Sequence, residues 1–320
     1  MNPPNAPSEY QTRVLPLSED AVADAARLIL AGEPVAVPTE TVYGLAADAT
    51  NAEAVARIYA AKGRPSFNPL IVHVLDGEAA ERLAIFSGAA RAVAAAFWPG
   101  PVTLVLPLRE GGELAPAVTA GLGTVAVRCP AHPAMRALLD ACGRPLAAPS
   151  ANASGRISPV SAAHVLSTLS GRLKLILDGG ISEEGLESTI VRIDEAGVAL
   201  LRPGPVEIGD IAAVAGLAEA EAGLTIQAPG QMASHYAPTK PVRLDAREAA
   251  AGEWLIGFRA VEGDESLSPS GDLREAAANV FSALHRAEAS AAERIAVAPI
   301  PEEGIGRAIN DRLRRAAARR

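Results

Sequence analysis

The sequence predicts an α/β protein: a mixed sheet with flanking helices, followed by a smaller α/β domain. Short runs rich in Val, Ile and Leu alternate with helical patterns along most of the 320 residues. Two such runs, at 188–193 and 198–201, flank the turn sequence Asp-Glu-Ala-Gly and indicate a hairpin, so the sheet cannot be all parallel. A chain of this length is expected to form two domains.

Capping residues mark the helix boundaries. Ser18 precedes two acidic residues and predicts a helix start, and Gly32 predicts the end of that helix. Asn51 and Gly63 bound a second helix in the same way, and Pro133 suits the first position of another. The predicted helices are 18–31, 51–62, 78–85, 89–97, 133–141, 161–169, 273–289 and one from 305. The predicted strands are 35–37, 70–74, 102–106, 124–129, 146–148, 173–177, 188–193, 198–201, 242–244, 254–258 and 295–298.

A weakly periodic stretch separates the two domains. Residues 227–238 contain two prolines and no helix or strand pattern, as expected of a linker. The basic end, 312–320, is expected to be a solvated helix tail. The predicted parts are a loose N-terminal tail at 1–13, a first domain at 14–215, a linker at 216–240 and a small C-terminal domain at 241–320.

Composition limits the classes of function. The net charge of −8 argues against a dedicated nucleic-acid-binding protein, which would usually be basic. No apolar run approaches the ~20 residues of a membrane span, and the N-terminus lacks a signal-peptide pattern. The two cysteines, Cys129 and Cys142, have neither a disulfide framework nor metal-ligand spacing. We therefore expect a cytoplasmic protein without membrane association.

Polar loops after apolar runs indicate a ligand site. The predicted strand at 35–37 is followed by PTETVYGL at 38–45, which places hydroxyls and backbone N–H groups at the carboxyl edge of a sheet. Ligands of α/β proteins bind at that edge. Lys62 and Arg64 follow a helix, and the stretch 150–158 supplies Ser, Asn and Arg after another strand. Together these loops predict a site for a phosphorylated ligand.

Each of these signals also has a plainer explanation. Lys62 and Arg64 could satisfy the carbonyl groups and the dipole of the preceding helix. His73 lies in an apolar strand, where it could be a core histidine or could face the ligand. Thr124 and Arg128 lie four residues apart on one strand and share a face. A buried guanidinium at that position requires a carboxylate or phosphate partner.

Common nucleotide and catalytic motifs are absent from the sequence. There is no Walker A loop, no dinucleotide-binding glycine fingerprint and no zinc-ligand spacing. No Ser, His and Asp arrangement stands out for acyl transfer. A nucleotide would therefore be held in a less common way, and no redox or organic cofactor is expected.

The ordered motifs resemble one family. The resemblance is to the YrdC-like L-threonylcarbamoyladenylate synthases over about residues 17–205, and to the long members of that family in His-Tyr-Ala-Pro at 235–238 and the second domain. It implies a twisted mixed YrdC-like sheet and a small Rossmann-like C-terminal domain. The segments that carry it are 38–45, 62–74, 98–103, 125–133, 147–152, 187–190 and 201–205.

The resemblance implies a reaction. A nucleotidyltransferase of this family forms threonylcarbamoyl-AMP and pyrophosphate from L-threonine, bicarbonate and ATP, for the N6-threonylcarbamoyladenosine modification at tRNA position 37. Mg²⁺ is expected with the ATP, although the sequence identifies no metal ligand. The implied partner is the downstream tRNA threonylcarbamoyl transferase machinery, and tight direct tRNA binding is not expected. Such chemistry depends on positioning and charge neutralisation more than on a covalent nucleophile.

The resemblance also implies site residues. L-threonine would be bound by Thr41, His73, Arg128, Ala148 and Ser188, with Arg128 pairing with its carboxylate. ATP would be bound by Arg64, Asn68, Thr124, Ser150, Ser158 and Arg202. The candidate catalytic residues, at four polar positions typical of the family, are Lys62, Arg64, Ser150 and Asn152.

Some alternatives stay open. Some longer relatives carry an aromatic linker residue where this chain has Ala233. Here the linker could contact ATP through its backbone, His235 or Tyr236 could substitute, or the linker could contribute less. A double-stranded RNA or tRNA-binding module without synthase activity is a second function, disfavoured by the acidic balance. A carbamoyl-adenylate-forming enzyme is a third, as in the related domain of hydrogenase-maturation carbamoyltransferases, whose cysteine-rich zinc segments this chain lacks.

Overall fold

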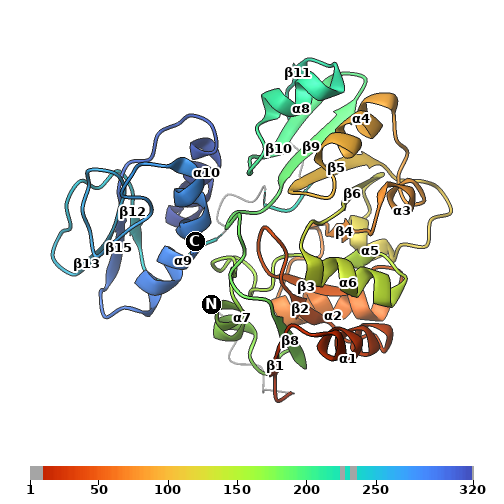
Figure 1. Ribbon diagram of the computed structural model, residues 1–320, viewed down its shortest axis with the longest axis horizontal. Helices are drawn as coiled ribbons and strands as arrows, with labels where there is room; N and C mark the ends of the chain where they lie inside the picture. Colours follow the sequence, from red (N-terminus) through yellow and green to blue (C-terminus); the bar gives the residue numbers. More distant parts are fainter. Residues whose placement is uncertain (1–9, 224–227, 231–235, 319–320) are drawn as a thin grey trace.

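The computed structural model describes residues 10–223, 228–230 and 236–318, which form two sheets with their helices (Figure 1). The strands of the first sheet are β1 (Arg13–Pro16), β2 (Val35–Val37), β3 (Gly44–Asp48), β4 (Ile71–His73), β5 (Val102–Pro107), β6 (Thr124–Arg128), β7 (Leu146–Ala147), β8 (Leu175–Asp178), β9 (Thr189–Asp194), β10 (Gly197–Arg202) and β11 (Glu219–Ala220). Its helices are α1 (Glu19–Leu30), α2 (Ala52–Lys62), α3 (Gly77–Glu81), α4 (Gly88–Phe97), α5 (Pro116–Thr119), α6 (Pro133–Cys142), α7 (Ala162–Leu169) and α8 (Ile208–Ala215).

The first sheet is mixed, as predicted. Its strand order among the described residues is β1-β8-β2-β3-β7-β4-β6-β5-β9-β10-β11. β4 runs parallel to β6 but antiparallel to β7, and β9 and β10 form the predicted antiparallel hairpin.

Alternating side chains on the strands feed two cores on opposite faces of this sheet. On β2, Val35 and Val37 pack with α1 and α6, whereas Ala36 faces the core shared with α2, α4, α7 and α8. α1 begins where Ser18 accepts a hydrogen bond from the N–H of Ala21, as its sequence predicts. Helices therefore cover both faces, and the sheet is the fixed support for the loops at its strand ends.

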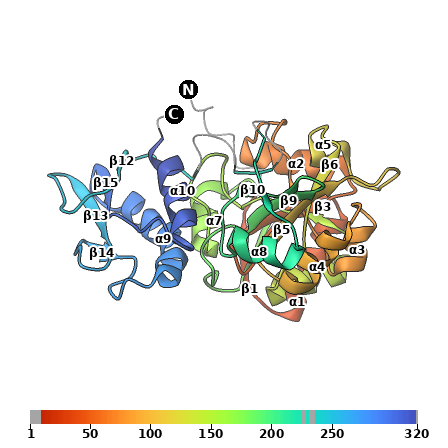
Figure 2. The same ribbon diagram turned by 90° about the horizontal axis from the view of Figure 1, so that it is seen from above.

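The C-terminal unit has an all-parallel sheet of order β12-β15-β13-β14, made of β12 (Val242–Arg243), β13 (Glu253–Gly257), β14 (Glu265–Ser266) and β15 (Arg294–Val297). Two helices, α9 (Leu273–Ala289) and α10 (Gly306–Ala317), pack on it and lie on the side that faces α7 and the first sheet (Figures 1 and 2). The predicted small α/β domain is confirmed.

Some elements differ from the prediction. The helices α5 and α8 and the strands β1, β3, β11 and β14 were not predicted. In β3, the sequence Gly-Leu-Ala-Ala-Asp lacks the β-branched and aromatic side chains that mark a strand. The strand β11 pairs with β10, so the first sheet extends into the segment expected to be linker. At the other end, the N–H of Tyr10 bonds to Gly171 and β1 pairs with β8, so part of the expected loose tail belongs to the sheet.

The expectation of a solvated tail is wrong for Arg312. Its side chain is 0% exposed and lies among charged and aromatic groups at the boundary between the two units. The reason is helical periodicity: positions 308, 309, 312, 313 and 316 form one buried stripe of α10. None of the helices in the described ranges is long and apolar enough to cross a membrane.

Candidate active site

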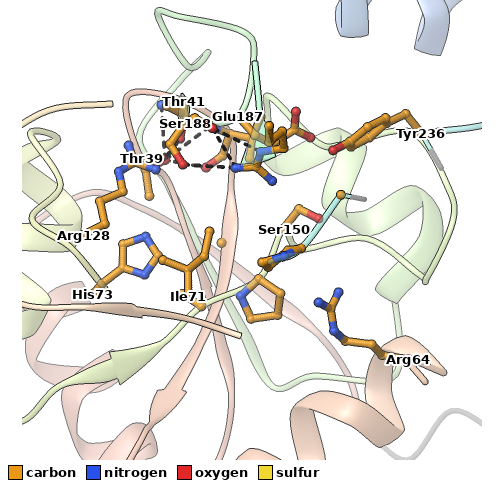
Figure 3. A pocket seen from close by; sticks show the side chains of 17 residues that line it. Thr39, Thr41, Arg64, Ile71, His73, Arg128, Ser150, Glu187, Ser188 and Tyr236 are labelled. Atoms are coloured by element: carbon orange, nitrogen blue, oxygen red, sulfur yellow. Dashed lines mark hydrogen bonds between the residues drawn. The ribbon is translucent and has the colours of Figure 1, made fainter. Parts of the chain in front are cut away.

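A small pocket lies across the face of the first sheet over β4 (Figure 3). Its free volume is about 40 Å³, far below the roughly 300 Å³ of a small-molecule site, so the walls have to move apart before a ligand can enter. β7 runs antiparallel to β4 and carries residues 148–150 back along it, so the pocket extends beyond the carboxyl edge predicted from sequence. The lining residues are Thr39, Thr41, Val42, Gly44, Arg64, Ile71, His73, Arg128, Ala148, Pro149, Ser150, Glu187, Ser188, Arg202, Pro229, Gly230 and Tyr236.

One end of the pocket is built around Arg128. This buried guanidinium donates to Thr41 Oγ1 at 2.9 Å, to Glu40 Oε1 at 2.6 Å and to the carbonyl oxygen of Gly100 at 3.2 Å. Burial alone would raise the pKa of Glu40, but Arg128 and the N–H of Ala131 outweigh it and hold that pKa below its usual value. Glu40 is therefore the carboxylate partner that the buried arginine was predicted to need, and it fixes the direction of the guanidinium.

His73 lies beside Arg128 because β4 and β6 pair in register, with the two residues as direct partners. Burial, reinforced by the charge of Arg128, lowers the pKa of His73 to about 3. The ring is therefore neutral at pH 7. Its Nδ1 is buried without a hydrogen-bond partner in the part of the chain that the structure describes. An unsatisfied buried nitrogen in a pocket wall is suited to a polar ligand group.

The hairpin β9–β10 supplies a second wall. Arg202, at the end of β10, donates to the carbonyl oxygen of Ser188 at 2.9 Å and to its hydroxyl at 3.0 Å. Gly204 brings the chain back against residues 187–189, where a Cβ would lie 2.3 Å from the nitrogen of Thr189 and 2.7 Å from the oxygen of Glu187. Only glycine permits this approach, which holds Ser188 against Arg202.

Arg64 lines the other end of the pocket, and Lys62 lies behind it (Figure 3 labels Arg64). The Nε and Nη2 atoms of Arg64 donate to the carbonyl oxygens of Asn68 and Pro69, at 3.2 and 2.8 Å. The Nζ of Lys62 donates to the carbonyl oxygens of Ser150 and Asn152, each at 2.5 Å. Burial lowers the pKa of both side chains, that of Arg64 to about 10. Lys62 thus holds the loop that carries Ser150.

Charge is distributed unevenly along the pocket. Arg128 is paired with Glu40, and no salt bridge to Arg64, Lys62 or Arg202 occurs among the described residues. One end therefore has a balanced pair, whereas the other has an excess of positive charge. An excess of buried cations is suited to a polyanion such as a triphosphate.

Pro229, Gly230 and Tyr236, which lie between the two sheets in the chain, line one side of the pocket. Gly230 packs so tightly that a Cβ would lie 2.6 Å from Tyr236 Oη and 2.8 Å from Arg202 Cδ, and its φ of +87° favours glycine. Tyr236 is buried and lines the pocket, whereas Ala233 and His235 lie outside the described residues.

The structure brings most of the predicted site residues together. Thr41, Arg64, His73, Arg128, Ala148, Ser150, Ser188 and Arg202 line the pocket. Three others support the lining: Lys62 holds Ser150, the carbonyl oxygen of Asn68 holds Arg64, and Ser158 donates to Glu187. Asn152 turns its amide onto Ala153 and Arg156, and Thr124 lies at the far end of β6 from Arg128.

Sequence reasoning gave no role to Glu40, Thr39 or Glu187, although all three lie in motifs that it singled out. The signal available was the buried arginine on β6, because a cation in that environment implies an acid nearby. Arg312, which belongs to the C-terminal unit and lies 2.8 Å from Glu187, was also given no role; the only sequence signal for its burial was the helical period of α10.

Comparison with known families covers both units of the chain. A family model described as "Telomere recombination" (Sua5, YciO and YrdC) matches residues 27–204, and one described as "Threonylcarbamoyl-AMP synthase, C-terminal domain" matches residues 206–318. The chain belongs to the threonylcarbamoyl-AMP synthase family. The resemblance found in the sequence is thereby confirmed.

Relatives of similar length share the family. The threonylcarbamoyl-AMP synthase of Bacillus subtilis is 39% identical, with 97% of this chain and 96% of the relative covered. That of Pyrococcus abyssi is also 39% identical, over 95% of this chain and 96% of the relative. The crystal structure of P. abyssi Sua5 complexed with L-threonine superposes with a TM-score of 0.87 at 37% identity, covering 96% of this chain and 98% of that one. The predicted fold class is confirmed by this match.

Proposed function

We propose that this chain is an L-threonylcarbamoyladenylate synthase, a nucleotidyltransferase that makes threonylcarbamoyl-AMP and pyrophosphate from L-threonine, bicarbonate and ATP. The observation that carries the proposal is one pocket with a fixed arginine at one end and excess positive charge at the other. The arginine can bind the carboxylate of an amino acid and the excess positive charge can bind a triphosphate, so one pocket can hold both reactants side by side.

The Arg128 end is assigned to L-threonine. A guanidinium has five N–H donors, and the contacts to Gly100, Thr41 and Glu40 use three of them. The remaining donors can bind the carboxylate of the amino acid, while Glu40 keeps the fork in place. The unpartnered Nδ1 of His73 and the hydroxyl of Ser188 line the same end, and Ile71 offers an apolar surface to the methyl group.

The Arg64 end is assigned to ATP. Arg64, Ser150 and Arg202 line it, and Ser158 reaches it through Glu187. The roles proposed for Asn68 and Thr124 in ATP binding, and for Lys62 and Asn152 in catalysis, rest on the family resemblance and on the contacts described above. In this arrangement Lys62 and Asn152 act on the loop that presents the Ser150 hydroxyl.

The reaction needs positioning and charge stabilisation. The amine of threonine adds to bicarbonate with loss of water to give a carbamate. A carbamate oxygen then attacks the α-phosphorus of ATP, and the bond to pyrophosphate breaks. Negative charge accumulates on the phosphate oxygens, where Arg64 and Arg202 can stabilise it. Two ends of one pocket hold the reacting groups, so the second step becomes effectively unimolecular.

The metal and the setting belong to the same proposal. Among the described residues no group of three His, Cys, Asp or Glu side chains could hold a metal ion, so we assign Mg²⁺ to the phosphates of ATP, as part of the substrate. We further propose a cytoplasmic location, a downstream tRNA threonylcarbamoyl transferase that consumes the product, and a first domain at 14–215, a linker at 216–240 and a C-terminal domain at 241–320.

Threonine-dependent pyrophosphate release tests the function. The protein with ATP and bicarbonate should release pyrophosphate when L-threonine is added and not when carbamoyl phosphate replaces it. Release with carbamoyl phosphate, or tight tRNA binding without any release, would replace this proposal with one of the alternatives.

Arg64→Ala tests the site. Loss of one charge-stabilising group should lower the rate about a hundredfold while the protein stays folded. Arg82→Ala is the matched control, because Arg82 is an exposed arginine that pairs with Glu78 on the surface. Equal rates in the two variants would contradict the role given to Arg64.

A further inference from the structure

Arg312 is a buried arginine of the C-terminal unit that lies behind the wall of the pocket. Its Nε lies 2.8 Å from Glu187 Oε2, and its guanidinium carbon lies 5.2 Å from the centre of the Tyr236 ring. Glu187 and Tyr236 both line the pocket, although Arg312 does not. A residue of α10 therefore contacts two walls of a pocket that is otherwise built on the first sheet.

Glu187 stands between Arg312 and the end assigned to ATP. Its Oε1 accepts a hydrogen bond from Ser158, and its Oε2 accepts one from Arg312. Burial would raise the pKa of Glu187, but Arg312 and then Arg202 outweigh it and keep that pKa below its usual value. The carboxylate is therefore ionised, close to the arginine that would bind phosphate.

An ionised carboxylate at this position would repel the negative charges of a bound triphosphate. Without Arg312, the charge of Glu187 would be balanced by Arg202, which would then offer little net charge to phosphate. Arg312 balances Glu187 from the side away from the pocket. The second partner of Arg312 is Asp311, which also accepts a hydrogen bond from Arg315. The single negative charge of Asp311 is therefore divided between two arginines, and Arg312 keeps positive charge to offer to Glu187.

We propose that Arg312 is a positioning residue for ATP: it balances the charge of Glu187 and holds that carboxylate against Ser158, so that the C-terminal unit completes the nucleotide end of the site. The inference rests on the proposed function and deepens it, because it gives the C-terminal unit a defined task in that reaction. Arg312 itself touches no substrate.

The test measures the KM for ATP and the KM for L-threonine separately, by pyrophosphate release. Arg312→Met removes the charge and keeps the length, Arg312→Lys keeps the charge, and Arg312→Gln keeps a hydrogen-bond donor without charge. Arg314→Met is the matched control, since Arg314 is an exposed arginine on the same helix that pairs with Glu302. Thermal unfolding of every variant separates folding defects from binding defects.

We expect Arg312→Met and Arg312→Gln to raise the KM for ATP roughly ten- to a hundredfold, because a charged hydrogen bond is lost and a carboxylate is left unbalanced. In these two variants the KM for L-threonine should stay within about threefold of the value for the unmodified protein. In Arg312→Lys and Arg314→Met, the KM for ATP and the KM for L-threonine should both stay within about threefold of that protein's values. If Arg312→Met does not fold, the two KM values are measured with Arg312→Gln as the neutral variant.

A double variant tests the route through Glu187. Adding Glu187→Gln to Arg312→Met removes the unbalanced carboxylate. The KM for ATP of the double variant should therefore return at least about half of the way to the unmodified value, measured in log KM. An unchanged KM for ATP in both neutral variants, or an equal rise in both KM values with a lowered Tm, would overturn the inference. If the unmodified protein released no pyrophosphate with threonine, the proposed function itself would be at fault.

Discussion

The boundary between the two units contains a pair of histidines that should make the protein sensitive to acid. His285 of α9 stacks on His164 of α7, with ring centroids 3.8 Å apart and planes inclined by 11°. The Nε2 of His285 lies 3.1 Å from the carbonyl oxygen of Ser158. Burial lowers the pKa of His285 to about 4, from an ordinary value of 6.5.

The sign follows from which state binds the proton first. As pH falls below about 6.5, His285 of the unfolded chain becomes protonated, whereas in the folded protein it stays neutral down to about 4. The contribution of His285 to stability is therefore complete above pH 6.5 and is lost between 6.5 and 4. At pH 5 the difference amounts to about 1.5 pH units at roughly 1.4 kcal/mol each, or about 2 kcal/mol in the free energy of unfolding.

Urea unfolding at pH 7.5 and pH 5 measures this loss. His285→Phe keeps a ring against His164 but cannot be protonated, so it should be less stable at pH 7.5 yet lose about 2 kcal/mol less on acidification. Carboxylates that titrate in this pH range change the free energy of unfolding of both proteins by the same amount, so their effect cancels in the comparison. Parallel losses in the two proteins would refute the reasoning, since His285 would then have an ordinary pKa in the folded state.

Two further outcomes concern the ends of the pocket. Glu40→Gln should raise the KM for L-threonine roughly tenfold while the KM for ATP changes less than about threefold, because the guanidinium that Glu40 orients loses a charged hydrogen bond. Steady-state pyrophosphate release decides this, and equal changes in both constants would contradict the assignment of ends. Gly230→Ala should lower the free energy of unfolding by about 1–3 kcal/mol, because its Cβ would overlap Arg202 and Tyr236 and its φ is positive. Chemical denaturation checks it, with Gly77→Ala, where a Cβ meets nothing within 4 Å, as the control expected to change little.

Much of the site could be predicted because its residues lie in polar loops bounded by strong strand and helix signals. The shared face of Thr124 and Arg128 correctly implied a buried cation in need of an acid, and Glu40 supplies it. The adjacency of His73 and Arg128 could not be predicted, because it depends on the register of two strands about fifty residues apart in the chain. The sequence does not give the order of the strands in the sheet, so it cannot show which polar loops lie opposite each other.

Arg312 shows a different limit. A run of arginines near a chain end is usually a solvated helix tail, and composition alone gives no reason to single one out. The helical period places position 312 with Ile309 and Leu313 on the buried face, which was the available signal. What lies opposite that face is set by the packing of two domains, and the partner, Glu187, is 125 residues away in the sequence.

Gly204 has a consequence for how this protein can vary. Its missing Cβ leaves room for the backbone before β9, so even alanine would displace the wall that carries Ser188. Every residue other than glycine would have to push this backbone aside. The shape of this wall therefore depends on an empty space and not on any side chain.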